Sequence, residues 1–404
     1  MIIAATKAAI LIQLRAFEPV LPRARTAELT DLAMALAVEA AAFRSSKTAA
    51  LAVELGELVR SMNCYYSNLI EGHHTHPIDI ERALTGVYDK APEKRNLQLE
   101  ARAHIEVQRL IDREQSPTPI MSEEFIRWLH RDFCERLPAD LLFVTDSVSG
   151  ERRQVIPGEY RDHHVEVGRH IAPDPDGVPN LMAQFVDAFA DANRTVAERI
   201  VLVASAHHRL LWVHPFLDGN GRVARLMSHA MLRACGVGSE LWSLPRGLAR
   251  DVEAYKAHLE AADEPRRGDL DGRGNLSDQA LADFCRFFLT VCLDQVRFMR
   301  GLLDTDGLQN RIRIWAKEEI GEGRLPAGAD TMLVHAASVG QFPRSDAARI
   351  TGYQERQART VLSALLARGL LKSDGPRAPA RLAFPASVAE RWLPLLYAPS
   401  TFTP

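Results

Sequence analysis

Residues 214–225 read HPFLDGNGRVAR and predict a junction between two helices. The apolar residues on both sides of this stretch recur at helical spacing. Gly219 and Gly221 allow backbone conformations that other residues rarely adopt. A glycine-rich loop that runs into a helix N-terminus presents N–H donors together with the positive end of the helix dipole. The stretch therefore predicts an anion site that suits phosphate groups.

The side chains of this stretch supply complementary chemistry. His214 can take a proton from an attacking hydroxyl near neutral pH. Asp218 offers the hard carboxylate that a phosphate-bound Mg²⁺ needs, and Asn220 can donate to a phosphate oxygen. Arg222 and Arg225 lie three residues apart on one helical face and can contact separate phosphate oxygens. A calcium loop is excluded, because its twelfth position holds histidine instead of glutamate.

These residues match the motif H-x-F-x-(D/E)-G-N-G-R-x-x-R at every defined position, so the chain resembles the Fic family. The resemblance implies a protein adenylyltransferase, an enzyme that transfers AMP from ATP to a Ser, Thr or Tyr hydroxyl of a protein, with Mg²⁺ (or Mn²⁺). It implies that His214 is the catalytic base and that Asp218 binds the metal. It also implies a set of nucleotide-binding residues: Asp218, Gly219, Asn220, Gly221, Arg222 and Arg225. Lys replaces Gly221 in phosphate-transferring relatives, so its presence here favours AMP transfer.

A second motif stands upstream, where Ser67 and Glu71 lie four residues apart on one helical face and Gly72 follows as a terminator. By itself this is a common capped helix end. Beside the first motif it resembles the inhibitory motif of the family, (S/T)-x-x-x-E-(G/N). The resemblance implies that Glu71 pairs with Arg225 and keeps this arginine from the γ-phosphate. In some relatives the same glutamate helps to remove AMP, so a reverse activity stays open.

Residues 157–170 predict a short hairpin that resembles the Fic flap, which aligns a target segment by main-chain pairing. A plain surface hairpin is the alternative. The resemblance adds further nucleotide contacts: Val167, Gly168, Arg169 and His170 from the flap, and Tyr255 and Asp263 from a later helix. Many relatives have paired tyrosines and Asn where this chain has Tyr255-Lys256 and Asp263, and a core tyrosine is the alternative for Tyr255.

The expected fold class is mainly α, with a Fic helical core, a β-hairpin flap and a C-terminal winged helix-turn-helix domain. The residues from 321 to 329 break helical periodicity and predict a linker. Beyond it, three helices and a hairpin resemble a winged helix, whose Arg356, Arg359 and Arg377 could face DNA phosphates. Protein docking or dimerisation is an open alternative for this unit. The expected domains are residues 1–76 with the inhibitory helix, 77–320 as the Fic core and 329–390 as the winged helix.

The composition, 47% hydrophobic and 25% charged, is that of a soluble globular protein. The net charge of -3 excludes a global attraction to nucleic acid or to an anionic membrane. Five cysteines without a C-x-x-C pair predict reduced thiols and a cytoplasmic protein. The apolar patch over residues 8–14 is too short to span a bilayer, so we expect no membrane partner.

The expected partners are ATP and unidentified target proteins, which include the chain itself, while a homodimer and DNA stay open. A second hypothesis is a DNA-binding regulator whose Fic core senses nucleotide without turnover. The presence of His214 and Asp218 favours the enzyme, because a sensor needs neither a base nor its metal ligand.

Overall fold

The computed structural model describes residues 16–145, 150–190, 193–238 and 240–397, so the apolar patch over 8–14 lies outside the described residues. The described chain is mainly helical, which confirms the predicted fold class. None of the helices within these ranges combines the length and the apolar character needed to cross a bilayer. The helices are α2 (Thr26–Ser45), α3 (Ala49–Ile70), α4 (Pro77–Leu84), α5 (Pro92–Asp112), α6 (Glu123–Cys134), α7 (Val178–Phe189), α8 (Val196–Val213), α9 (Asn220–Ala234), α10 (Leu244–Ala249), α11 (Val252–Asp263), α12 (Asp278–Leu302), α13 (Thr305–Gly321), α14 (Ala329–Val339), α15 (Ala347–Thr351), α16 (Glu355–Ala367) and α17 (Ala386–Trp392).

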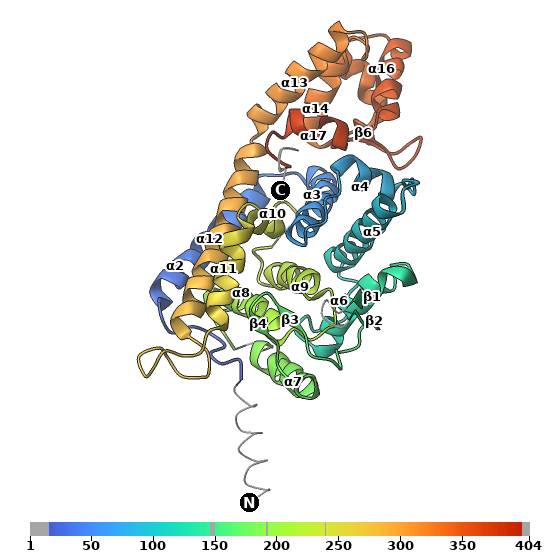
Figure 1. Ribbon diagram of the computed structural model, residues 1–404. Helices are drawn as coiled ribbons and strands as arrows, with labels where there is room; N and C mark the ends of the chain where they lie inside the picture. Colours follow the sequence, from blue (N-terminus) through green and yellow to red (C-terminus); the bar gives the residue numbers. More distant parts are fainter. Residues whose placement is uncertain (1–15, 146–149, 191–192, 239, 398–404) are drawn as a thin grey trace, which may run out of the picture.

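Helices α8 and α9 form the centre of the helical body (Figure 1). Helix α8 begins at a capping box in which Thr195 and Glu198 each bond to the other's backbone. Helices α2, α7, α9, α11 and α12 all pack against α8. A helix that is surrounded in this way has little need of a polar face, which explains why most of α8 is buried. The loop at residues 214–219, within the predicted junction, therefore follows directly after a helix that is packed on all sides.

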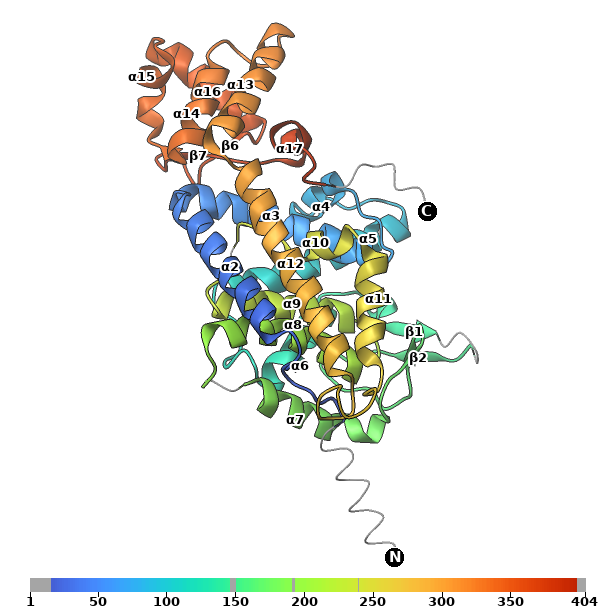
Figure 2. The same cartoon turned by 90° about the vertical axis from the view of Figure 1, so that its left-hand side faces the viewer.

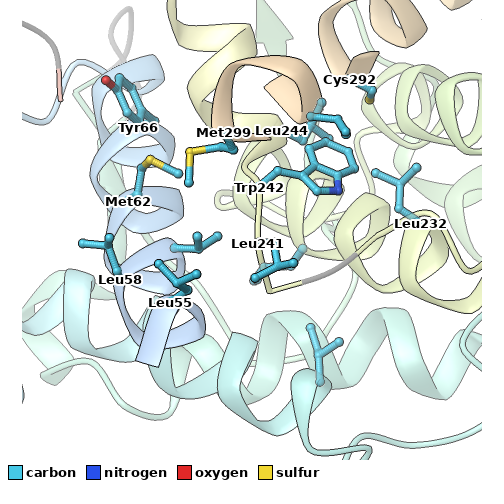
Figure 3. Packing of buried hydrophobic residues seen from close by; sticks show 14 of the residues in the cluster. Leu55, Leu58, Met62, Tyr66, Leu232, Leu241, Trp242, Leu244, Cys292 and Met299 are labelled. Atoms are coloured by element: carbon cyan, nitrogen blue, oxygen red, sulfur yellow. The ribbon is translucent and has the colours of Figure 1, made fainter. Parts of the chain in front are cut away.

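Helix α3, which carries the second motif, is fixed by its apolar face. Met62 of α3 lies against Met299, and Leu55 faces Leu241 (Figure 3). These four side chains and that of Leu58 are buried. Each such side chain contributes about 1.5–3 kcal/mol when it is removed from water. This packing sets where the last turn of α3 stands relative to α9.

Two short antiparallel hairpins lie beside this body. In the predicted flap, β3 (Glu166–Val167) pairs with β4 (His170–Ile171), with Val167 opposite His170. Gly168 takes φ of 61° in the two-residue turn, a conformation that glycine adopts at little cost. The second hairpin, β1 (Phe143–Thr145) with β2 (Arg152–Gln154), was not predicted, because three-residue strands leave almost no periodicity in the sequence.

The C-terminal unit combines α14, α15 and α16 with a three-stranded antiparallel sheet in the order β5 (Gln341–Phe342), β7 (Ala380–Leu382), β6 (Leu371–Lys372). This arrangement is compatible with the predicted winged helix-turn-helix, and β5 adds a strand that was not predicted. Helix α13 ends at Gly321, where the predicted linker begins, and packs along α14. The domain bounds 1–76, 77–320 and 329–390 stay predictions.

The C-terminal unit is tied to α3, the helix with the second motif. The hydroxyl of Tyr66, next to Ser67, donates to the carbonyl of Leu396 at 2.9 Å. At the other end of α3, the buried Glu54 pairs with Arg381 of β7. Figure 2 shows β7 and α17 beside α3 and α4. A change in the C-terminal unit therefore bears directly on α3.

Candidate active site

The loop of the first motif is closed by its own side chains. The backbone N–H of Phe216 donates to Oδ1 of Asn220 at 2.9 Å, and Nδ2 of Asn220 donates to the carbonyl of Phe216 at 2.8 Å. Phe216 is fully buried and stacks on His130 with ring centroids 4.0 Å apart. Asn220, expected to donate to phosphate, thus spends its amide on holding the loop, although it also lines the cavity described below.

Arg161 lies within the predicted hairpin of residues 157–170, where no role was predicted for it. Its side chain and backbone bind the flap to this loop. Its Nε donates to the carbonyl of His214 at 2.8 Å, and its backbone N–H donates to the carbonyl of Pro215 at 2.9 Å. A third contact runs from its guanidinium to the carbonyl of Pro173 at 2.5 Å. Arg161 is 3% exposed, so these bonds replace water completely. The only signal in the sequence was its place in the Pro-Gly-Glu-Tyr-Arg stretch.

The junction turns sharply at two left-handed residues. His214 ends α8 with φ of 50°, and Gly219 precedes α9 with φ of 78°. Only the second of these positions is glycine, so His214 carries the cost of an unusual conformation for a side-chain-bearing residue. This geometry directs the start of α9, with its unpaired N–H groups, toward the same space as His214. The backbone therefore directs the start of α9 toward the space where the anion site is predicted.

A cavity of about 580 Å³ opens over the start of α9. Its wall includes His214 and residues 217–222 from the first motif, Glu71 from α3 and residues 164–167 from the flap. Thr145 and Arg153 of the β1–β2 hairpin close one side. Elements that lie more than 100 residues apart in the sequence therefore meet in one cavity, as the two motifs predicted.

Arg225 is held by both predicted partners on α3. Its Nε donates to Oγ of Ser67 at 2.8 Å, and its NH2 group donates to Oε1 of Glu71 at 2.5 Å. The Arg225 side chain is 2% exposed. Burial alone would raise the pKa of Glu71, but the charges of Arg225 and Arg222 outweigh it and lower this pKa. Glu71 is therefore ionised, and the predicted contact between Glu71 and Arg225 is present.

The carboxylate of Glu71 stands where glycine makes room for it. A methyl group on Gly221 would collide with Oε1 of Glu71 and would press on NH1 of Arg225. Gly72, directly after Glu71, takes φ of 81°, as expected for a glycine past a helix end. The first motif thus has a place for a carboxylate of the protein at the start of α9.

The second arginine, Arg222, has a carboxylate partner that was not predicted. Its NH2 group donates to Oε2 of Glu100 on α5 at 2.8 Å, and the same oxygen lies 2.9 Å from Nδ1 of His73. The hydrogen bond with Glu100 raises the pKa of His73. Glu100 precedes Arg222 by 122 residues without any motif around it, so only the packing of α5 beside α9 brings the two together.

A second cavity, of about 240 Å³, lies on the other side of His214. Leu211 and Leu259 give it apolar walls, and Val167 and Gly168 of the flap cover it. The polar groups of its wall come from the flap and from α8 and α11: His170, His208, Lys256, Glu260 and Asp263. The predicted residues Val167, Gly168, His170 and Asp263 are thus brought together here.

Two other predicted nucleotide contacts lie elsewhere. Tyr255 is a core residue, 2% exposed, and its hydroxyl bonds to Nε2 of His207 at 2.7 Å. Its neighbour Lys256 lines the cavity instead, because a step of one residue along α11 turns the side chain by about 100°. Arg169 points outward, with 85% of its side chain exposed, and pairs with Glu260 at 2.6 Å.

His214 is held in its neutral form. Burial, followed by the positive charge of His170, lowers the pKa of His214 to about 4. At neutral pH its imidazole therefore has a free lone pair and can accept a proton. Asp218 stands four residues on, and its Oδ1 accepts from the N–H of Gly219 at 2.6 Å. A proton acceptor and a carboxylate therefore face the same cavity.

Within the described residues, His, Cys, Asp and Glu side chains gather nowhere in a group of three that could hold a metal ion. A nucleotide-bound Mg²⁺ needs less, since it keeps waters and phosphate oxygens and takes one or two carboxylates. Asp218 lines the cavity beside the start of α9, so its oxygen donor fits this kind of Mg²⁺ site.

Comparison with known proteins agrees with this geometry. Residues 120–232 match the model of the Fic/DOC family. The chain is 28% identical over 176 residues to a protein from Nematostella vectensis named "Protein adenylyltransferase Fic", a match that covers 43% of this chain and 37% of that protein. It is 34% identical over 97 residues to the protein of the same name from Drosophila melanogaster, covering 24% and 20% of the two chains. The chain thus matches 37% of the length of the first relative and 20% of the second.

A structural comparison extends the likeness to the fold. The crystal structure of a Fic family protein from Desulfovibrio desulfuricans G20 superposes with a TM-score of 0.50 at 18% identity, covering 90% of this chain and 98% of that one. At this identity the likeness concerns the fold alone. The family match spans α6, the flap, α8 and most of α9, while Glu71 and the α11 residues of the two cavities lie outside it. Residues 120–232 of this chain therefore form a Fic/DOC domain.

Proposed function

We propose that this chain is a protein adenylyltransferase that transfers the AMP part of ATP to a hydroxyl side chain of a protein. The observation that carries the proposal is the position of His214, which is neutral, faces the 580 Å³ cavity and also lines the 240 Å³ cavity. A nucleotide whose phosphates lie at the start of α9 and whose base lies in the apolar cavity would pass directly beside this imidazole. The names of the similar proteins from Nematostella and Drosophila support the same activity.

The reaction would be an in-line displacement at the α-phosphorus. The oxygen of the target hydroxyl forms a bond to this phosphorus, and the bond to the bridging oxygen of the β-phosphate breaks, so that pyrophosphate leaves. His214 takes the hydroxyl proton as the new bond forms. The N–H groups at the start of α9 and the guanidinium of Arg225 would stabilise the phosphate charge. Asp218 would hold Mg²⁺, which when bound neutralises further phosphate charge.

In this proposal Glu71 is a built-in inhibitor. Its carboxylate takes the guanidinium of Arg225 at 2.5 Å and fills the space beside Gly221. A charged hydrogen bond of this kind contributes about 1.5–3 kcal/mol. The γ-phosphate of ATP would have to displace Glu71 before it could reach Arg225. The same carboxylate lines the cavity and could orient a water there. Removal of AMP from a modified protein would then use Glu71, and the release of AMP from the modified protein measures this activity.

DNA binding through the C-terminal unit is not added to the proposal. Arg359 on α16 pairs with Glu355 at 3.0 Å, and Arg381 on β7 pairs with both Glu54 and Asp374. These carboxylates offset the charge of Arg359 and Arg381, and contact of Arg356 and Arg377 with DNA phosphates stays a prediction. The regulator hypothesis is tested instead as an outcome of the transfer assay.

The test compares ATP labelled on the α-phosphate with ATP labelled on the γ-phosphate. The full chain with Glu71→Gly, in which Arg225 is free, should incorporate the α label into protein in the presence of Mg²⁺ and should not incorporate the γ label. His214→Ala should lower incorporation by a factor on the order of 10²–10⁴, the usual contribution of a general base. Incorporation of the γ label would indicate phosphate transfer. Nucleotide binding without incorporation, equal in both proteins, would support the regulator that senses nucleotide.

A further inference from the structure

The imidazole of His170, on strand β4, lies between two hydrogen-bond acceptors. Its Nδ1 is 3.3 Å from Oδ2 of Asp263 on α11. Its Nε2 is 2.8 Å from the carbonyl oxygen of Trp212 in the last turn of α8. The side chain of His170 is 11% exposed, so water contributes little to either contact. The ring therefore spans the flap, α8 and α11.

This geometry fixes where the protons are. A neutral imidazole has one N–H, and a carboxylate and a carbonyl only accept, so both contacts of His170 require its doubly protonated, cationic form. The other oxygen of Asp263 accepts from Nε2 of His208 at 3.1 Å, while Nδ1 of His208 faces the guanidinium of Arg209 at 3.0 Å. His208 is therefore a neutral donor through Nε2, and the positive charge rests on His170.

The electrostatic surroundings agree with this assignment. Burial lowers the pKa of His170, but its hydrogen bond and ion pair with Asp263 outweigh this and raise it. Burial lowers the pKa of His208, and the two histidines hold the pKa of Asp263 well below its usual range. Arg161, from the residues before the flap, acts against the cation on His170.

The other titratable groups around His170 are His214, Lys256 and Glu260, which line the same cavity. His214 is only two residues beyond the Trp212 carbonyl that His170 holds. The cation on His170 is also the largest charge effect that lowers the pKa of His214. The protonation of His170 therefore affects both how the flap is held and the pKa of His214.

We propose that His170, kept cationic by Asp263, is a positioning residue for AMP transfer that fastens strand β4 to the end of α8, two residues before His214. This inference rests on the proposed function. It gives Asp263 and His170 a role other than the nucleotide contact that the family resemblance implies. The carboxylate is essential to this role, because an amide at position 263 could bond to His170 but could not hold its charge.

The proposal predicts an alkaline limit to activity. The pKa of His170 is raised in the folded chain, so its tie to Asp263 is complete below the usual value near 6.5 and is lost as the pH rises through the raised pKa. His214 stays neutral over this whole range, because its pKa is about 4. A fall in activity above neutral pH therefore reports His170 and not the base.

The experiment uses the full chain with Glu71→Gly, so that transfer is measurable, and the chain itself as target. The parameters kcat and KM for ATP are determined from pH 5.5 to 9.5, and NMR of ring-labelled histidine follows the titration of His170. Asp263→Asn should lower the pKa of His170 and move the alkaline limit down with it. It should lower kcat more than it changes KM. Asp263→Glu should restore both the titration and the limit.

Asp162→Asn is the matched control, since Asp162 forms an exposed pair with His163 on the same flap at 2.5 Å. It should leave the alkaline limit in place. A raised KM for ATP in Asp263→Asn with an unchanged pH profile would make Asp263 a nucleotide contact and overturn the proposal. An unperturbed His170 titration in the parent protein would overturn it as well. Failure of AMP transfer in every variant would reject the proposed function alone, because the NMR titration is read without turnover.

Discussion

The two cavities beside His214 differ in how their charges are matched. At the larger cavity, Arg222 in the wall and Arg225 buried behind it are each bound to a carboxylate from a distant part of the chain. These carboxylates are Glu71, at the end of α3, for Arg225 and Glu100 of α5 for Arg222. In the smaller cavity, Asp263 is matched by histidines that belong to the same wall, and the space between apolar side chains is left open. On the proposed function, the phosphates of ATP would have to displace protein carboxylates, whereas its base would only have to enter the open space.

This difference would allow ATP to bind through its base before its phosphates reach the position needed for transfer. An apolar base can be held in the smaller cavity while both arginines are still paired with protein carboxylates. Contacts of the base would then contribute most of the affinity for ATP, and the placement of the phosphates would be the regulated step. Variants at the two cavities test whether base contacts and phosphate contacts act separately in this way.

The largest effect is expected at Glu71. Glu71→Gly frees Arg225, and loss of one charged hydrogen bond of about 1.5–3 kcal/mol predicts a rise in labelling from α-labelled ATP of roughly 10- to 100-fold. The initial rate of self-labelling at subsaturating ATP measures it. Glu57→Gln on the same helix is the matched control, because Glu57 also pairs with arginines, Arg60 and Arg109, outside both cavities. Equal labelling in Glu71→Gly and the parent chain would remove Glu71 as an inhibitor.

A smaller effect is expected at Glu100. Glu100→Gln weakens the hold on Arg222, and a net contribution of about 1 kcal/mol predicts roughly fivefold tighter binding of ATP. Calorimetric titration with ATP and with adenosine separates the two cavities, since adenosine has no phosphates. Adenosine binding should stay unchanged. If Glu100→Gln instead weakens ATP binding, Glu100 orients Arg222 for phosphate and does not compete with it.

A third prediction concerns the anchor of α3 outside the site. Tyr66→Phe removes the bond to the carbonyl of Leu396 and should cost about 1 kcal/mol, or about 2 °C in Tm. Because Glu71 ends the same helix, self-labelling should rise modestly while adenosine binding stays constant. The melting curve and the labelling rate are the measurements. A stabilised protein, or altered adenosine binding, would contradict this link between the C-terminal unit and the larger cavity.

The smallest effect is a pH dependence from His73. Its pKa is raised by Glu100, so its contact with Glu100 is fully present below pH about 6.5 and is lost as the pH rises through the raised pKa. Above that pKa Glu100 is left to Arg222 alone, which favours the protein contact over phosphate. His73 is partly exposed, which limits the effect to about twofold weaker ATP binding on the alkaline side. Binding of ATP at pH 6 and pH 8.5 measures it. The difference should vanish in Glu100→Gln, and its persistence there would assign the effect to another group.

Local patterns predicted the parts of the site that depend on neighbours in the chain. The glycine loop, the face shared by Ser67 and Glu71, and the hairpin at Val167 are all settled within a few residues, by backbone freedom or by helical spacing. The pairing of Glu71 with Arg225 was predicted only through the family resemblance. Tyr255 shows the limit of that resemblance, because the rotation of α11 turns it into the core and brings Lys256 to the cavity.

The sequence by itself determined the central helices, the left-handed turn before α9 and the types of chemical group that the loop offers, because these follow from interactions within a turn or two of chain. Only the tertiary structure decided which charges meet. Glu100 reaches Arg222 across 122 residues, and Asp263 reaches His170 across 93, through the packing of whole helices. Helix packing is set by the burial of many apolar side chains at once, so no short pattern encodes the position of a single carboxylate.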